Sequence, residues 1–364
     1  MTNKLKLTTA LASSLLVLGA SSAVAQTTVS GNLALSYLTS KSENKAKSFR
    51  GFGKESQINI SNKGKLNNGL DYVAGFSIEM DGGDGMTASS GSGAENPTVN
   101  TLQGQQSENV YIDFISGNTT VSIGADHFQN MDTNMSHIVG FGYIAPDGVN
   151  DKRSLYPSNV ENYQAYGIGI SQKTDIGTFG ALYTPTALNG QAYNDIFNAA
   201  GKIAVERGAE SAYDLTYKGD LGIKGLNLGV SYMSAARNST GVVADMKSTR
   251  VGAQYNFGQF TLGYDRSREE NGQAMTAKAS GTKYNGDSYG IAYAVNKDVS
   301  VGYTYAEAKA DATTATKKEY INIIAVGYNL GPVSVQGQYK NAQNVAGDAA
   351  SDGQQLGVYL NTKF

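Results

Sequence analysis

The residue types that most often carry out chemistry are scarce in this sequence of 364 residues, which has two histidines and no cysteine. The lack of cysteine excludes disulfides, thiolate zinc sites, iron–sulfur clusters and c-type haem attachment. His127 and His137 flank Asp132, but two histidines at this spacing in a loop are weak evidence for a metal or nucleophilic site. No H-E-x-x-H, G-x-S-x-G or complete P-loop motif occurs. We therefore predict no catalytic residue, no metal centre and no cofactor.

Clustered aspartates are the next candidates for chemistry. The run from Asp81 to Gly85 and the pair Asp147 and Asp151 resemble calcium ligands only in residue type. Calcium prefers several oxygen ligands around a turn, but the EF-hand pattern and its bidentate glutamate are missing. Polar loops are therefore favoured, and calcium binding by segment 128–160 stays open. The net charge of −2 and the lack of a basic stripe argue against a nucleic-acid partner.

The first 25 residues have the pattern of a cleaved signal peptide. Lys4 and Lys6 precede an apolar stretch over residues 11–20, and Ala23-Val24-Ala25 is a small-x-small cleavage site. The most apolar run after it, 321–328, is shorter than the ~20 residues that a membrane helix needs. We expect a mature chain of one domain, 26–364, without a membrane-spanning helix.

Apolar and polar residues alternate along most of the mature chain, which indicates β-strands with two different faces. At 226–233, for example, the apolar face is predicted to consist of Leu226, Leu228, Val230 and Tyr232. Sixteen such segments are expected, at 28–38, 54–62, 69–81, 107–115, 119–127, 161–173, 177–186, 210–219, 225–235, 247–257, 259–268, 285–295, 298–308, 318–329, 332–341 and 353–364.

The connections between these segments are alternately short and long, and 128–160 is the longest. Membrane β-barrels show this asymmetry, with tight turns at one end and long loops at the other. Aromatic residues on the apolar face gather near both ends of the strands, as expected at two lipid–water interfaces. They are Tyr37, Tyr183, Tyr232, Tyr305 and Tyr339 near the long loops, and Phe114, Phe179, Tyr217, Phe257, Phe260, Tyr328 and Phe364 near the short turns.

The final strand ends in Phe364 on the outward face. With this residue, the signal peptide and the sixteen alternating segments, the chain resembles the sixteen-stranded, trimeric general porins of Gram-negative bacteria. The resemblance implies an all-β fold, a closed antiparallel transmembrane barrel with short periplasmic turns, long external loops and a third loop folded inward. It also implies an outer-membrane location surrounded by lipid, a homotrimer, and Phe364 as part of the signal read by the barrel-assembly machinery.

A sixteen-stranded barrel is too wide for its own side chains to fill, so it encloses water. We therefore expect a channel for passive diffusion of small hydrophilic solutes and ions, and no enzyme activity. A substrate-specific channel, with inward Tyr111 or Tyr359 contacting the substrate, is the nearest alternative. A secreted β-rich adhesion protein fits less well, because it would not need the aromatic belts or the terminal Phe364. An outer-membrane enzyme would need a Ser/His or Asp/His constellation that the two histidines do not supply.

Strand parity predicts which charges line the channel. The second to fifth segments place Glu55, Asp71, Glu79, Asp113 and Asp126 inward, with no inward Lys or Arg within the expected spans. The loop at 128–160 adds Asp132, Asp147 and Asp151, while the inward basic residues fall on later strands, at Lys173, Lys218, Arg250 and Lys340. Because a wall of one charge sign concentrates counter-ions, we expect moderate cation preference that weakens as salt rises.

Overall fold

The computed structural model describes residues 26–42, 48–79, 106–125, 127–128, 167–185, 209–237, 245–270, 283–311, 317–344 and 352–364. The expected signal peptide at 1–25 and most of segment 128–160 lie outside these ranges. Within them, no helix is long and apolar enough to cross a membrane.

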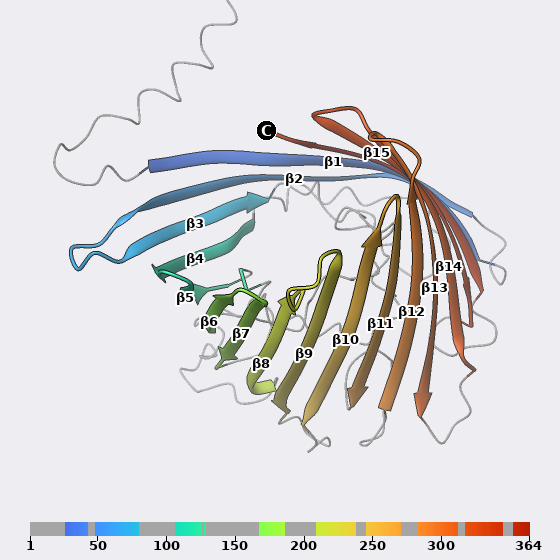
Figure 1. Ribbon diagram of the computed structural model, residues 1–364. Helices are drawn as coiled ribbons and strands as arrows, with labels where there is room; N and C mark the ends of the chain where they lie inside the picture. Colours follow the sequence, from blue (N-terminus) through green and yellow to red (C-terminus); the bar gives the residue numbers. More distant parts are fainter. Residues whose placement is uncertain are drawn as a thin grey trace, which may run out of the picture.

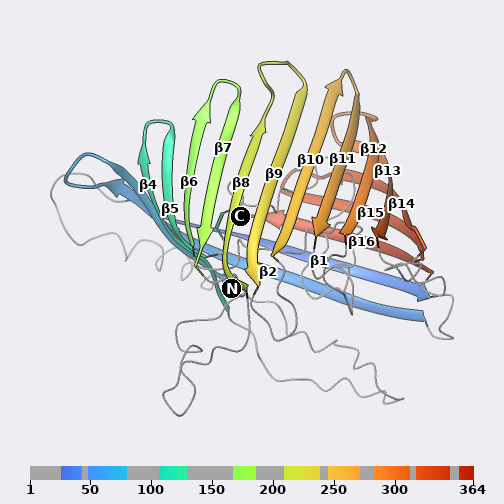
Figure 2. The ribbon, with the colours of Figure 1, turned by 90° about the horizontal axis from the view of Figure 1, so that it is seen from below.

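The described residues form sixteen antiparallel strands that close into one barrel (Figures 1 and 2). The strands are β1 (Gln26–Ser42), β2 (Ser48–Lys65), β3 (Asp71–Glu79), β4 (Gln106–Ser116), β5 (Thr119–Gly124), β6 (Gly167–Thr174), β7 (Gly177–Thr184), β8 (Ala209–Gly219), β9 (Leu226–Arg237), β10 (Met246–Phe257), β11 (Phe260–Glu270), β12 (Lys283–Ala294), β13 (Val299–Asp311), β14 (Glu319–Asn329), β15 (Val333–Gln343) and β16 (Gly353–Lys363). The predicted closed, sixteen-stranded antiparallel barrel is confirmed.

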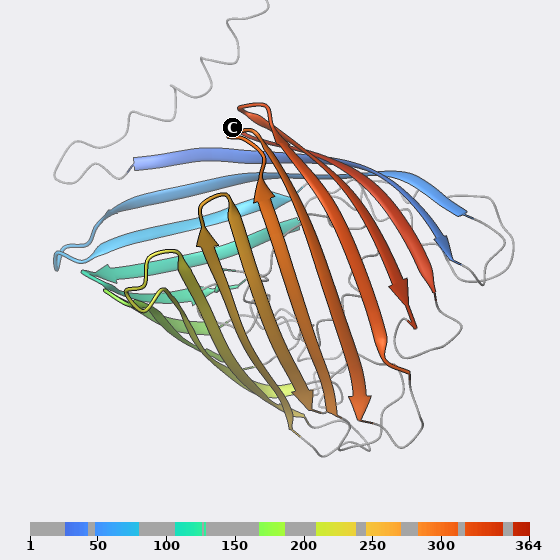
Figure 3. The same cartoon turned by 45° about the vertical axis from the view of Figure 1, so that its right-hand side comes forward.

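Every strand pairs with its neighbours in sequence, and β1 also pairs with β16 to close the ring (Figure 3). Closure matters in lipid because a sheet edge would leave backbone N–H and C=O groups without hydrogen-bond partners. The short turns gather at one end, as between β8 and β9 and between β10 and β11 (Figure 1). At the β10–β11 turn Gly258 has a φ of 58°, a conformation that costs glycine little.

The last residue seals the junction between the first and last strands at the short-turn end. Gly31 N–H donates to the carbonyl oxygen of Phe364 at 2.8 Å, and Phe364 N–H donates to that of Gly31 at 2.9 Å. A Cβ on Gly31 would lie 2.4 Å from the Phe364 ring, so glycine leaves room for the aromatic side chain. Phe364 is exposed on the outer face of the barrel, as the sequence predicts.

Outward and inward residues alternate as expected. On β9, Val230 is exposed on the outer face, whereas Ser231 and Met233 are buried inside. Outward aromatic rings form two rows. One row crosses β11–β14, from mid-strand on β11 to the long-loop end of β14: Tyr264, Tyr289, Tyr305 and Tyr320 follow one another with ring centroids 5.1–6.3 Å apart. At the short-turn end, Tyr255, Phe257, Phe260 and Tyr293 form a second row at 4.9–6.1 Å.

Two expected strand boundaries are wrong in ways that affect the lumen. The second strand extends to Lys65 rather than ending at residue 62. The fifth strand ends at Gly124 rather than continuing to residue 127. A β-bulge in β4 at Asn109, whose φ is 49°, lies beside this end, and Ala125 N–H donates to the carbonyl oxygen of Val110 at 2.8 Å. The chain then leaves the sheet and enters the barrel.

Candidate channel lumen

The inward face of β2–β5 carries the acidic side chains expected there. Asp113 lies opposite inward Ser122, and Glu79 is buried at the long-loop end of β3. Asp71 lies at the short-turn end of the same strand. Glu55 pairs in register with inward Ala34, which places it on the luminal face, although its side chain is not among those described.

The expected spans of these strands contain no inward basic residue, but the second strand continues beyond its expected end. Because β2 is longer than expected, its inward parity reaches Lys63 and Lys65 at the short-turn end. The Lys65 Nζ lies 2.6 Å from Asp71 Oδ1, and both side chains are more than half exposed. An exposed pair of this kind contributes little to stability, but it offsets the charge of Asp71 at the channel mouth.

Beyond β5 the chain turns into the lumen and meets the wall it has just left. The His127 ring stacks on the Tyr111 ring at a centroid distance of 3.5 Å and an interplanar angle of 3°. His127 Nε2 also lies 3.1 Å from Asp113 Oδ2. Phe128 is fully buried and packs against Leu182, an inward residue of β7. Phe128, the first residue of the long segment 128–160, therefore lies inside the barrel rather than outside it.

The basic residues expected on later strands all occupy inward positions. Arg250 is buried, with its Nε 3.5 Å from Asp265 Oδ1 on the neighbouring strand β11. Lys340 is buried on β15. Lys173 lies opposite Thr178 near the end of β6, and Lys218 pairs with the same threonine near the end of β8. Lys173 and Lys218 therefore flank one residue of β7, whereas Arg250 and Lys340 lie on other parts of the wall.

Four buried acids on β8, β11 and β14 were not singled out from the sequence, although they also lie on the inward face. Asp265 is the partner of Arg250, and the other three come from β8, β11 and β14. Strand parity, which identified the basic residues, places these acids on the inward face as well. The four are Asp214, Asp265, Glu269 and Glu319.

The described luminal charges are sorted along the barrel axis. Five lysines lie within two residues of the short-turn end of their strands: Lys63, Lys65, Lys173, Lys218 and Lys363. Five acids lie at mid-strand or at the long-loop end: Glu79, Asp214, Asp265, Glu269 and Glu319. Two acids, Asp71 and Asp113, lie in the short-turn half with the lysines. Two basic residues, Arg250 and Lys340, lie in the long-loop half with the acids. The long-loop half is therefore acidic and the short-turn half basic.

Four predicted lining residues cannot be placed. Asp126, Asp132, Asp147 and Asp151 lie outside the described residues. Strand parity does not assign Asp126 to the inward face, because β5 ends at Gly124, before this residue. Among the described residues, no group of three or more His, Cys, Asp or Glu side chains is arranged to hold a metal ion.

The sequence profile of the family described as Gram-negative porin matches residues 10–359. A search of curated protein sequences found no match. Among solved structures, the barrel is similar to the anion-selective porin from Comamonas acidovorans, with a TM-score of 0.67 at 14% identity, covering 94% of this chain and all of the other.

Two further structures have the same fold. OmpF from Salmonella typhi, solved with daunomycin, has a TM-score of 0.66 at 12% identity and covers 93% of this chain and 97% of its own. The trimer form of OmpT, an outer membrane protein of Vibrio cholerae, has a TM-score of 0.59 at 13% identity, with 93% and 99% covered. Together with the family match over nearly the whole sequence, the closed barrel identifies this chain as a member of the Gram-negative porin family, located in the outer membrane.

Proposed function

We propose that the chain forms a water-filled pore through which small hydrophilic solutes and ions diffuse passively, without catalysis. The observation that carries this proposal is a closed ring of sixteen strands with apolar residues outside and charged residues inside. The purified protein, inserted into a planar bilayer, should produce discrete conductance steps. A preparation that inserts as a folded barrel but gives no steps would contradict the proposal.

Segment 128–160 is proposed to narrow this pore. Its support is the placement of His127 and Phe128, which lie against Tyr111 and Leu182 on the luminal wall. A loop that starts there has to cross or line the lumen before it can leave. Asp132, Asp147 and Asp151 would then contribute to the lining, together with the strand residues described above.

Moderate cation preference is a further proposal, supported by the five buried acids of the long-loop half. The name of the Comamonas acidovorans protein shows that a barrel of this fold can be anion-selective, so charge placement rather than fold decides the sign. The reversal potential under a KCl gradient measures the preference. A pore that prefers chloride at low salt would contradict it.

Assembly is proposed to follow the same family pattern. One similar structure is described as a trimer form, which supports a homotrimer, and the outward Phe364 supports recognition of β16 by the barrel-assembly machinery. Residues 1–25 are proposed to be removed on export. Mass measurement of the detergent-solubilised complex tests the trimer, and N-terminal sequencing, expected to begin at Gln26, tests the cleavage.

A substrate-specific channel is the second candidate. The stacked pair Tyr111 and His127 presents aromatic surface inside the lumen, whereas Tyr359, the other inward tyrosine considered for substrate contact, is buried on β16. Aromatic faces of this kind bind sugar rings through apolar contact. Concentration-dependent block of the ion current by one sugar but not by others of equal size would favour this candidate over general diffusion.

A further inference from the structure

Hydrogen-bond donors gather on the luminal wall where β6, β7 and β8 approach the short-turn end. These three strands pair in sequence and lie side by side (Figure 2). Six of their inward positions form two rows of register neighbours: Lys173, Thr178 and Lys218 nearer the short turns, and Ser171, Gly180 and Thr216 one step further along the strands. We call these six residues the β6–β8 patch.

The side chains of the patch are donors, and none of its six positions is acidic. A lysine ammonium only donates hydrogen bonds, and a serine or threonine hydroxyl donates or accepts. The acids nearby belong to other features of the wall. Asp175 lies in the β6–β7 turn, and Asp220 Oδ1 accepts from Gly222 N–H at 2.9 Å within the β8–β9 turn. Asp214, two residues beyond Thr216, is buried.

The two lysines are spaced to act on one ligand. Lys173 and Lys218 are both register neighbours of Thr178, one on either side of it. Neighbouring strands lie about 4.8 Å apart, so the two lysine Cα atoms are separated by roughly 10 Å on the same face. Lys173 is exposed and Lys218 is partly exposed. Two long, flexible side chains at this spacing can bring both ammonium groups to a single anion in front of Thr178.

The surroundings of the patch favour a ligand that enters from the short-turn mouth. Gly180 lies at the centre of the upper row, and Gly229 is the register neighbour of Lys218 on β9, so no side chain projects from either position. Leu182 follows two residues beyond Gly180, and Phe128 packs against it. The apolar contact of Phe128 with Leu182 therefore bounds the patch on the side of the long loops.

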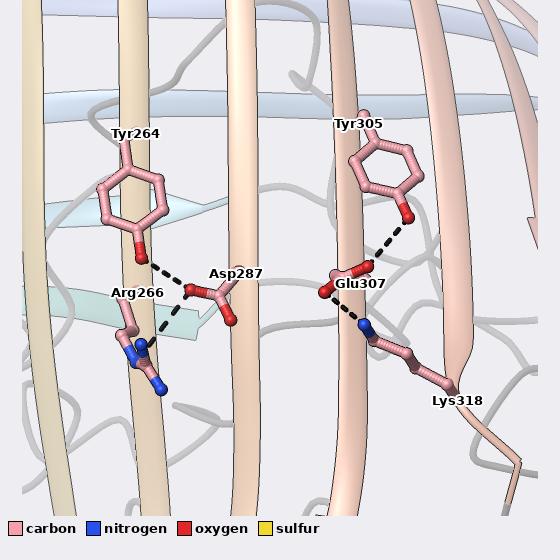
Figure 4. Close-up of polar contacts among 6 residues, drawn as sticks. All are labelled: Tyr264, Arg266, Asp287, Tyr305, Glu307 and Lys318. Carbon is pink, nitrogen blue, oxygen red and sulfur yellow. Dashed lines mark hydrogen bonds and ion pairs between the residues drawn. The ribbon is translucent and has the colours of Figure 1, made fainter.

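Charges on the outer face show the opposite arrangement, because acids and bases there lie beside each other. Arg266 Nε lies 4.0 Å from Asp287 Oδ1, and Lys318 donates to Glu307, as Figure 4 shows. Each of these acids offsets the charge of a neighbouring base. The β6–β8 patch contains two bases and no acid among its members, so its own charge is positive and suits an anion from solution.

We propose that the β6–β8 patch binds a phosphate group, either of inorganic phosphate or of a small phosphomonoester in the lumen. A phosphate group presents several strong acceptor oxygens and carries more than one negative charge near neutral pH. Lysine binds phosphate as a point charge, and the hydroxyl groups between and above the two lysines supply further donors. The inference adds a binding site to the proposed route of passive diffusion. Binding requires only the folded barrel, so it can be measured apart from conduction.

The test measures binding to the folded, detergent-solubilised protein by titration calorimetry at 0.15 M salt, with inorganic phosphate, glucose 6-phosphate and glucose as probes. The patch variant is Lys173→Gln with Lys218→Gln. The control is Lys63→Gln with Lys65→Gln, which removes two exposed inward lysines of the same end on β2, four strands away from β6. Four strand spacings are roughly 19 Å, well beyond the screening length of about 8 Å at this salt concentration.

The unmodified protein should bind inorganic phosphate saturably, and the patch variant should bind it roughly twentyfold more weakly. One unit charge about 4 Å from another changes a binding constant about fivefold in water, and two lysines are removed. The control should stay within about twofold of the unmodified protein, and glucose should not distinguish the three. Binding of glucose 6-phosphate that depends on the same lysines would identify phosphomonoesters as ligands, and binding of inorganic phosphate alone would identify the free ion. An equal loss in patch variant and control, or no saturable phosphate binding by the unmodified protein, would overturn the proposal.

A third variant tests the site without changing any charge. Thr178→Val keeps the shape of the side chain and both lysines but removes the hydroxyl between them. It should weaken phosphate binding about threefold or more, as expected for the loss of one hydrogen bond. Unchanged binding would mean that the lysines attract anions only at a distance, which would contradict a site at this position. All variants should still form conductance steps in planar bilayers. A barrel that conducts but binds no phosphate would overturn this inference alone, whereas a folded barrel without steps would contradict the proposed pore.

Discussion

The two halves of the lumen differ in the charge of their lining side chains and in the chain segments that lie near them. The short-turn half contains five lysines near the strand ends and is sealed by the Phe364–Gly31 pairing of β1 and β16. The long-loop half contains Glu79, Asp214, Asp265, Glu269 and Glu319. Segment 128–160 begins between them, where His127 and Phe128 meet the luminal wall.

The sign of the lining charge therefore changes along the barrel axis, from acidic in the long-loop half to basic in the short-turn half. A cation entering from the long-loop end meets acids first, whereas an anion entering from the other end meets lysines first. Charges in a low-dielectric wall raise the local concentration of counter-ions, and salt screens the effect. We therefore expect the two halves to oppose each other in selectivity, with the outcome set by the half in which the pore is narrower.

The largest effect is expected from weakening the β1–β16 pairing that closes the barrel at the short-turn end. Deleting Phe364 removes an outward aromatic ring and both backbone hydrogen bonds to Gly31. We predict poor insertion and degradation of the chain, measured as the amount of heat-modifiable barrel in isolated outer membranes. Val358→Ala, an outward change in the interior of β16, is the control and should lower the yield only slightly. Equal yields for the deletion and the unmodified chain would rule out this role for Phe364.

The next largest effect is expected from segment 128–160, which we propose narrows the pore. Shortening 128–160 while keeping His127 and Phe128 should raise single-channel conductance and admit larger sugars in liposome-swelling measurements. Shortening 187–208, which connects β7 to β8, provides a control at the same end of the barrel. If both variants conduct like the unmodified pore, the constriction proposed for 128–160 is wrong.

The fold was predictable because each strand has one side that faces the lumen and one that faces lipid. Apolar and polar residues therefore alternate along the strand, and this pattern is visible in the sequence. Val230, Ser231 and Met233 lie on the faces that parity assigns to them. The strand ends were less predictable. Beyond the apolar band, outward positions need not be apolar, so the polar run from Asn62 to Lys65 contains no signal that β2 continues.

The inward turn after β5 illustrates the other limit. It depends on the bulge at Asn109 and on the contact of His127 with Tyr111 and Asp113, which join residues from two strands. No sequence pattern near Gly124 indicates those contacts, so the predicted fifth strand extends three residues beyond the end of β5.

Opposite changes in the two halves should shift selectivity in opposite directions. Glu79→Gln removes an acid from the long-loop half and should lower the ratio of potassium to chloride permeability. Lys63→Gln with Lys173→Gln removes two bases from the short-turn half and should raise it. A unit charge about 4 Å from an ion is worth about 1 kcal/mol in water, so each substitution is limited to roughly a fivefold change. Reversal potentials at low ionic strength measure the ratio, and shifts of the same sign would refute the axial arrangement.

The smallest effect is expected from Asp113, one of the two acids that lie in the basic half. Its carboxylate is not presented freely to the lumen, because His127 Nε2 lies 3.1 Å from Oδ2 while the imidazole ring stacks on Tyr111. Asp113→Asn should therefore change the permeability ratio less than Glu79→Gln. In a His127→Ala background the carboxylate would be uncovered, and the same Asp113→Asn change should then have the larger effect. Residues in direct contact are expected to be non-additive in this way. Additive effects in the double-mutant cycle would show that His127 does not modulate the charge of Asp113, and Asp113 would then have to be counted as a full member of the cation-attracting set.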